Sequence, residues 1–117
     1  MTADSRFQFI EPTQVQDLVD QGSILVDIRE REELDQIAPG ARVIPLSELS
    51  KGFKPEFLSS DSVIYYCRSG RRTSINADLL FTAAQPARKL YIVNGGIFAW
   101  TEQGCTLEKC DLRGIAA

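Results

Sequence analysis

The chain contains no histidine, and its only thiols belong to three cysteines. Without histidine it can form neither a Cys–His dyad nor a Ser–His–Asp triad, and it lacks the usual nitrogen ligand of zinc sites. A small and odd number of cysteines argues against a disulfide framework and for a reducing compartment. Any nucleophile in this chain must therefore be activated by groups other than histidine.

Long apolar runs and an excess of positive charge are also missing. The net charge is −3 and the pI is about 4.9, which leaves no basis for binding the phosphates of a nucleic acid. No apolar run approaches the length of a membrane span, and the first residues carry charge where a signal peptide would be apolar. We expect a cytoplasmic protein with neither a nucleic-acid partner nor a membrane partner.

The 117 residues have an ordinary composition for one globular domain, with 44% hydrophobic and 25% charged residues. No internal repeat, low-complexity run or linker divides the sequence. We therefore expect a single domain over residues 1–117, with its core at about 8–104 and a C-terminal tail at 105–117.

Short apolar runs alternate with segments of helical period, a pattern typical of α/β domains. It predicts a central, mainly parallel β-sheet flanked by helices on both faces. Strands are expected at 24–28, 41–44, 63–66 and 90–93. Helices are expected from Pro12 to before Gly22, at 29–34, after Leu46, before Pro86 with Ile75, Leu79, Leu80 and Ala83 on its buried face, and from Phe98 to before Gly104.

The most informative segment follows the strand at 63–66 and leads into a helix. It reads Cys67-Arg68-Ser69-Gly70-Arg71-Arg72-Thr73-Ser74. Ligands of parallel sheets bind beyond the carboxyl ends of the strands, where Cys67 is expected. Gly70 permits backbone conformations that a β-carbon forbids, and Thr73 and Ser74 are suitable N-caps for the helix. Nearby cations, backbone N–H groups and a helix N-terminus favour a thiolate over a thiol.

A lone cysteine after an apolar strand is more often a small core residue than a nucleophile. Three arginines within the next five residues favour the functional interpretation here. Burying cations beside an inert thiol would serve no packing purpose.

These residues resemble the active-site loop of the rhodanese family, a cysteine followed by a short turn rich in glycine and arginine. The segment 26–30 resembles the Asp-x-Arg element of that family, and 95–100, closed by Gly104, resembles its Gly-Gly…Trp element. The three elements occur in the family's order and spacing between about Ile10 and Gly104. Residues 71–78 are particularly close to the rhodanese domain of a membrane sulfurtransferase, whose membrane-spanning part we do not expect here.

The resemblance implies a rhodanese-like fold and a thiosulfate sulfurtransferase that works by a ping-pong reaction. The Cys67 thiolate would take the outer sulfur of a small anionic donor such as thiosulfate. The resulting persulfide would pass that sulfur to cyanide or to a thiol, for example that of a thioredoxin-like protein. The covalent persulfide implies that no cofactor or metal ion is needed. The resemblance assigns substrate binding to Arg68, Ser69, Gly70, Arg71, Arg72 and Thr73, and support to Asp27, Arg29 and Ser74.

The remaining family elements suggest structural roles. Asp27 is expected at a strand end, bonded to backbone or to an arginine near the loop. The charged run 29–35 is expected to be a solvated helix face with i,i+4 pairs. Trp100 is expected in the core, and Gly95 and Gly96 in a turn.

Three alternatives remain open on the sequence. Cysteine-dependent phosphatases and arsenate reductases of similar topology carry an arginine six positions after the nucleophile, but that position is Thr73 here. A non-catalytic regulatory module of this family would typically lack the cysteine. A redox module would need Cys105 or Cys110 to resolve an oxidised Cys67, and we expect these two cysteines to be incidental.

Overall fold

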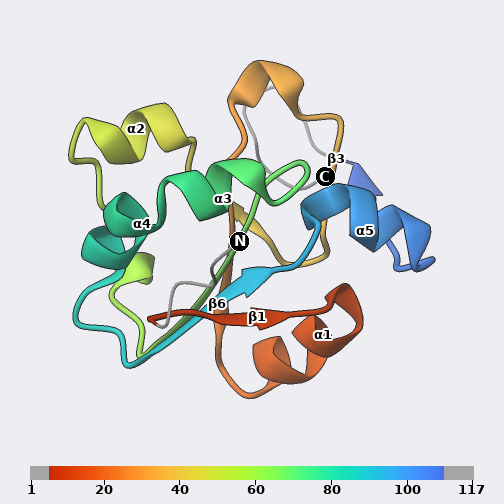
Figure 1. The fold of residues 1–117 in the computed structure, drawn as a ribbon, viewed down its shortest axis with the longest axis horizontal. Helices are drawn as coiled ribbons and strands as arrows, with labels where there is room; N and C mark the ends of the chain where they lie inside the picture. Colours follow the sequence, from red (N-terminus) through yellow and green to blue (C-terminus); the bar gives the residue numbers. More distant parts are fainter. Residues whose placement is uncertain (1–5, 110–117) are drawn as a thin grey trace.

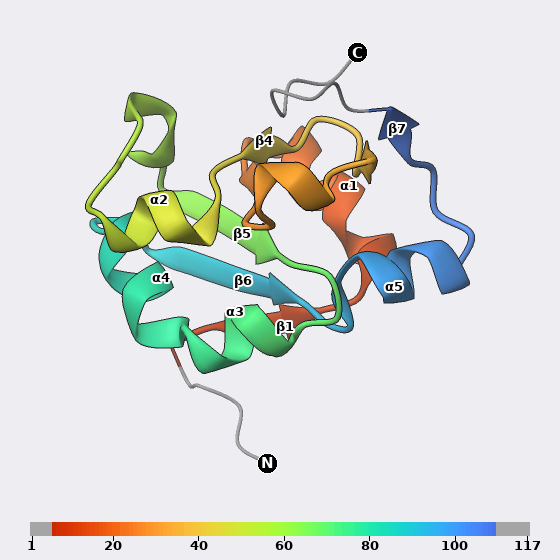
Figure 2. The same ribbon diagram turned by 90° about the horizontal axis from the view of Figure 1, so that it is seen from above.

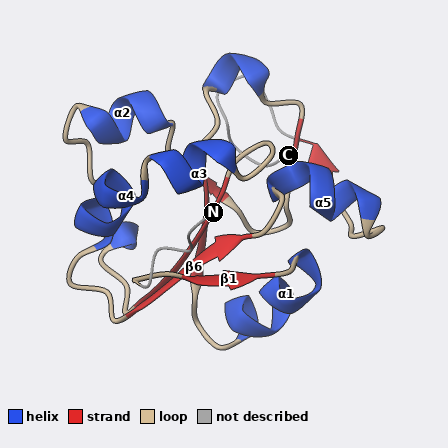
Figure 3. Cartoon of the chain, in the orientation of Figure 1, coloured by secondary structure: helices blue, strands red, loops and turns tan. Residues whose placement is uncertain are grey.

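The computed structural model describes residues 6–109 and is built around a five-stranded sheet (Figures 1 and 3). All neighbouring strands in this sheet are parallel. The predicted α/β class with a mainly parallel sheet is therefore confirmed. The strands lie in the order β1 (Gln8–Ile10), β6 (Lys89–Val93), β5 (Ser62–Tyr66), β2 (Ile24–Asp27) and β4 (Arg42–Val43).

Helices cover both faces of the sheet (Figure 2). On β5, Val63 and Tyr65 point to one face and Ile64 and Tyr66 to the other, because side chains alternate along a strand. All four are fully buried, so both faces need a helical cover. One face packs against α2 (Leu46–Ser50), η2 (Glu56–Leu58, a 3-10 helix) and α4 (Ala77–Ala84); the other packs against α1 (Pro12–Asp20) and α5 (Gly96–Glu102).

The parallel arrangement brings the carboxyl ends of β2 and β5 to the same edge of the sheet. In the register of these two strands, Asp27 lies opposite Tyr66. β2 leads into η1 (Arg31–Glu33, a 3-10 helix), and β5 leads through the Cys67 loop into α3 (Arg71–Ile75). The two segments that carry the predicted site are thus neighbours at this edge.

The predicted helix before Pro86 is divided in two. Asn76 interrupts it with φ −103° and ψ 26°, and the Asn76 side chain donates to the carbonyl of Arg72 at 2.9 Å. Such local bonding by an asparagine competes with regular helical pairing. The break changes the buried face, so Leu80 is buried as predicted, but Ile75 is 67% exposed and that prediction is wrong.

Three strands lie outside the sequence prediction. β1 has only three residues before Pro12, too few to show a period. β3 (Gln36–Ile37) and β7 (Glu108–Lys109) form a separate antiparallel pair. Residues 105–109, assigned to a tail from the sequence, therefore contribute a strand. Within residues 6–109, no helix has the length and apolar character needed to cross a membrane.

Candidate active site

Cys67 follows the last residue of β5 and has no exposed surface. Its sulfur accepts a hydrogen bond from the backbone N–H of Gly70 at 3.1 Å. The Thr73 hydroxyl lies 3.8 Å from the same sulfur. The sulfur is thus enclosed by the loop that begins with its own residue.

Gly70 shapes this loop. Its φ of +93° lies in the left-handed region, which glycine adopts without the strain that a β-carbon brings. This turn lets α3 begin at Arg71, so Thr73 and Ser74 lie inside the helix, and the N-cap prediction for them is wrong. Both hydroxyls instead donate to the Gly70 carbonyl at 2.9 Å.

The Gly95–Gly96 turn, predicted from the sequence, also packs against the backbone of the Cys67 loop. A β-carbon on Gly96 would lie 2.5 Å from the carbonyl oxygen of Cys67 and 2.7 Å from the carbonyl carbon of Arg68. Beyond the turn, the N–H of Ile97 donates to the Cys67 carbonyl at 2.9 Å, and that of Phe98 to the Arg68 carbonyl at 3.0 Å. The first turn of α5 therefore fixes the first two carbonyls of the loop. The adjacent glycines were the only sequence signal for this contact.

The three loop arginines do not converge on the sulfur. Arg68 and Arg71 are exposed, as is Ser69. Arg72 is half-buried and its guanidinium binds the carboxylate of Glu33 through two nitrogens, one at 2.8 Å. Among the described residues 6–109, Arg72 is thus the loop arginine that forms an ion pair.

The Arg72–Glu33 pair perturbs both groups. Hydrogen bonds from Arg72 lower the pKa of Glu33 to about 2, against the effect of burial, which raises it. The pKa of Arg72 is raised, first by the hydrogen bonds to Glu33, while burial lowers it; the charges of Glu33 and Cys67 add to the rise. Nothing in the local sequence signals this pair, because the partners are 39 residues apart.

Asp27 and Arg29 form a buried ion pair at the end of β2. The Asp27 carboxylate accepts from the Arg29 backbone N–H at 2.9 Å and from its Nη2 at 2.7 Å. Nη2 also donates to the carbonyl of Gln36 at 2.7 Å. Burial lowers the pKa of Arg29, but the hydrogen bonds and charge of Asp27 outweigh it and raise the pKa above its ordinary value. The pair ties β2 to β3, and its supporting role toward the loop stays a prediction.

The charged run 29–35 does not behave as predicted. Arg29 bonds to Asp27 and Gln36, and Glu30 and Glu33 cap each other. The single turn of η1 is too short to present a helix face of i,i+4 pairs, and Glu30, Arg31 and Glu33 also bond to residues of α2 and α3. Arg31 pairs with Glu48 at 3.3 Å, and Glu30 accepts from the hydroxyl of Ser47 at 2.6 Å. The run is therefore a junction between η1, α2 and α3.

Trp100 belongs to the core, as predicted. Its ring is stacked on Tyr66 with centroids 6.3 Å apart, and its Nε1 donates to the carbonyl of Thr106 at 2.8 Å. Cys105 packs half-buried against the same cluster as a free thiol. Cys110 lies outside the described residues. Within residues 6–109, no group of three or more acidic or thiol side chains is arranged to hold a metal ion.

Comparisons with known proteins agree with this architecture. A sequence model of the Rhodanese-like domain matches residues 11–103. A search of curated proteins gives no match.

Three solved structures share the fold. A thiosulfate sulfurtransferase from Pseudomonas aeruginosa superimposes with a TM-score of 0.69 at 24% identity, over 90% of this chain and 21% of its own. SseA from Escherichia coli, described as a 3-mercaptopyruvate sulfotransferase of rhodanese fold, gives 0.66 at 18% identity, over 88% and 52%. A Rhodopseudomonas palustris protein described as a possible tyrosine phosphatase gives 0.70 at 22% identity, over 89% and 86%. Identities this low establish similarity of fold.

Proposed function

Because this chain belongs to the rhodanese-like domain family, as its three motifs predict, we propose that it is a sulfurtransferase that carries sulfur as a persulfide on Cys67. The observation that carries the proposal is the Gly70 N–H aimed at the Cys67 sulfur from 3.1 Å. A hydrogen bond to the charged form of a group favours that form, so this donor stabilises a sulfur anion. The persulfide is itself the sulfur carrier, and the proposal includes no cofactor or metal ion.

In the first half-reaction, the Cys67 thiolate attacks the outer sulfur of thiosulfate. A bond forms between the Cys67 sulfur and that outer sulfur, and the sulfur–sulfur bond of thiosulfate breaks. Its electron pair leaves with sulfite, and the negative charge remains on the new outer sulfur of the Cys67 persulfide. Because both reactants are anions, nearby cations and N–H donors lower the barrier.

In the second half-reaction, cyanide or an acceptor thiolate attacks the outer sulfur of the persulfide. The bond from that sulfur to Cys67 breaks, its electrons return to Cys67 as a thiolate, and the product is thiocyanate or a new persulfide. No external oxidant or reductant is required. The enzyme returns to its starting state.

The loop arginines have different roles in this reaction. Arg68 and Arg71 are exposed and carry the charge that attracts a dianionic donor. Arg72 is held by Glu33, and the charge of Cys67 contributes to its raised pKa. Since Cys67 has no exposed surface in this conformation, the donor reaches its sulfur only after a local movement of the residues around it.

The loop is poorly suited to a phosphatase. A Cys-x5-Arg loop would place a phosphate-binding guanidinium at position 73, which is occupied by a buried threonine whose hydroxyl donates to Gly70. The guanidinium one position earlier, on Arg72, already binds Glu33. A loop with one residue fewer before its arginine fits a sulfur-sized group better than a phosphoryl group.

The proposal is tested by thiosulfate:cyanide activity in the wild type, Cys67→Ser and Cys105→Ser. Cys105 is the other described free thiol and serves as the matched control. We expect activity to vanish only in Cys67→Ser, and wild-type Cys67 to gain about 32 Da, one sulfur atom, after incubation with donor.

Other outcomes would favour the alternatives. Hydrolysis of p-nitrophenyl phosphate without sulfur transfer would favour a phosphatase. Absence of added sulfur with thiosulfate, 3-mercaptopyruvate and an organic persulfide would refute the proposal and favour a non-catalytic module.

A further inference from the structure

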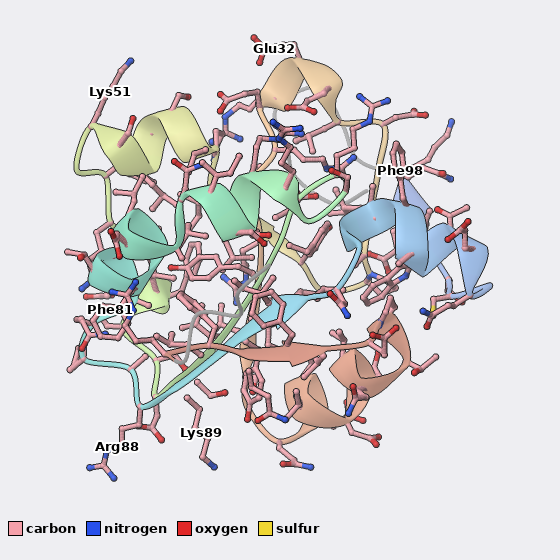
Figure 4. The ribbon with its side chains drawn as sticks, viewed as in Figure 1. Glu32, Lys51, Phe81, Arg88, Lys89 and Phe98 are labelled. Carbon is pink, nitrogen blue, oxygen red and sulfur yellow. The ribbon has the colours of Figure 1, made fainter. Side chains whose placement is uncertain are left out.

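Two exposed apolar side chains belong to the helices that adjoin the Cys67 loop. In the part of the chain that the structure describes, the large exposed apolar side chains are Phe53 at 50%, Ile75 at 67% and Phe98 at 53%. Phe98 lies on the first turn of α5 (Figure 4), and its N–H binds the loop carbonyl of Arg68. Ile75 ends α3, the helix into which the loop runs. Two of the three therefore belong to the elements that border the loop.

Each of these two apolar side chains has a cation beside it. The guanidinium of Arg68 lies over the Phe98 ring, 5.4 Å from its centroid. Arg71 precedes Ile75 by four residues in α3, which places both on one side of the helix. Neither Arg68 nor Arg71 forms an ion pair with another residue of the described range, in contrast to Arg72. Within residues 6–109 these two cations therefore have no carboxylate partner, although the chain carries a net charge of −3.

We propose that this surface, the loop rim of Arg68, Arg71, Ile75 and Phe98, docks a protein whose reactive cysteine has acidic and apolar neighbours. The inference rests on the proposed function and names the acceptor class for its second half-reaction. The thiolate of that partner attacks the outer sulfur of the Cys67 persulfide. The Cys67–sulfur bond breaks, Cys67 keeps the electron pair, and the partner leaves as the persulfide.

The burial of Cys67 and the positive charge of the loop rim both favour a partner of this kind. Cys67 has no exposed surface and its sulfur is enclosed by the loop that follows it, so a cysteine on a macromolecule must approach at this loop, where Arg68 and Arg71 are exposed. Carboxylates on the partner would pair with the exposed Arg68 and Arg71, and the apolar side chains of the loop rim would be covered. Aromatic and arginine side chains are also those most often dominant in protein interfaces.

A recess of about 210 Å³ lies next to Phe98. Its apolar lining comes from Ile97, Phe98 and Leu107, and its polar lining comes from Arg29, Glu33, Asp35, Gln36, Arg68 and Thr101. Asp35 is exposed and forms no ion pair with another described residue. Its negative charge would repel an acidic side chain of the partner at the recess. We therefore place the carboxylates of the partner over the loop and its apolar residue over the recess.

The first experiment follows sulfur transfer from the isolated Cys67 persulfide of the full chain to two peptides. Both carry one cysteine next to one leucine; the other neighbours are glutamates in one peptide and lysines in the other. Rates are measured by quenched mass spectrometry and divided by the thiolate concentration of each peptide. We expect the acidic peptide to react about tenfold faster at low salt, and this preference to shrink as salt screens the charges.

The second experiment removes the apolar rim. Phe98→Ser and Ile75→Ser should each slow transfer to the acidic peptide by about fivefold, the effect expected of a significant interface contact. Thiosulfate:cyanide turnover of Ile75→Ser should stay unchanged, and unchanged midpoints of urea unfolding would show that both variants fold. Phe53→Ser removes an equally exposed phenylalanine that does not border the loop and should change neither rate. Asp35→Asn should speed transfer to the acidic peptide.

The results separate this inference from the proposed function. If wild-type Cys67 gains no sulfur, the proposed function fails and the inference fails with it. If Cys67 gains sulfur but both peptides react equally, or Phe98→Ser behaves like Phe53→Ser, the loop rim is not a docking surface and small thiols or cyanide are the acceptors.

Discussion

Replacing Gly96 by alanine should displace the Cys67 loop, because this glycine touches the loop backbone directly. The new β-carbon would lie 2.5 Å from the Cys67 carbonyl oxygen and 2.7 Å from the Arg68 carbonyl carbon. Both contacts are with backbone, so no flexible side chain can swing away. The loop or the first turn of α5 must move by roughly half an ångström to relieve the overlap.

Two costs contribute to the loss of stability. Gly96 has φ +57°, and an alanine in the left-handed region costs about 1–2 kcal/mol. Overpacking against fixed backbone costs about 1–3 kcal/mol more. The free energy of unfolding should therefore fall by about 2–5 kcal/mol. A loop displaced by a fraction of an ångström should also lose about tenfold or more in sulfurtransferase rate.

Gly104→Ala is the matched control. Gly104 has φ +74° but no atom within 4 Å of its added β-carbon, so it carries only the backbone cost. Urea unfolding and thiosulfate:cyanide turnover would be measured for both variants. If Gly96→Ala loses no more stability than Gly104→Ala and keeps wild-type turnover, the contact between the glycine turn and the loop does not position Cys67.

Two further predictions concern the charged residues beside the loop. Asp27→Asn should lower the free energy of unfolding in urea by about 3–5 kcal/mol, because it leaves the Arg29 cation buried without its partner. The control, Asp61→Asn at an exposed site, should change it by less than about 0.5 kcal/mol. Equal losses in the two variants would contradict this view. Glu33 has its pKa lowered to about 2 by Arg72, so its contribution is complete above its ordinary pKa of 4.5 and is lost as the pH falls from there through about 2. Glu33→Gln should therefore be less stable than the wild type by about 1–2 kcal/mol at pH 7, discounted for partial exposure, and the difference should vanish near pH 2. A difference that is constant with pH would mean that the ion pair is not its source.

Much of the fold follows from local patterns. Pro12 opens α1 as predicted, and the apolar runs at β2, β5 and β6 are strands. Turn chemistry at Gly70 and at Gly95–Gly96 was also visible, since positive φ is a property of a single residue. The wrong prediction for the start of α3 also has a local cause. The residue that caps α3 is Gly70, with its positive φ, and not Thr73 or Ser74.

The sequence by itself determined the parallel α/β architecture, the family and the position of Cys67 after a buried strand, because each depends on the order of neighbouring residues. Only the tertiary structure decided which groups surround the sulfur. The Glu33–Arg72 pair, the approach of Gly96 to Cys67 and the β3–β7 pairing join residues about 30 to 70 positions apart. Such contacts arise when separate elements pack on one sheet edge, and one sequence carries no local periodicity that would reveal them. The same packing left Arg68, Arg71, Ile75 and Phe98 exposed, and so produced the loop rim.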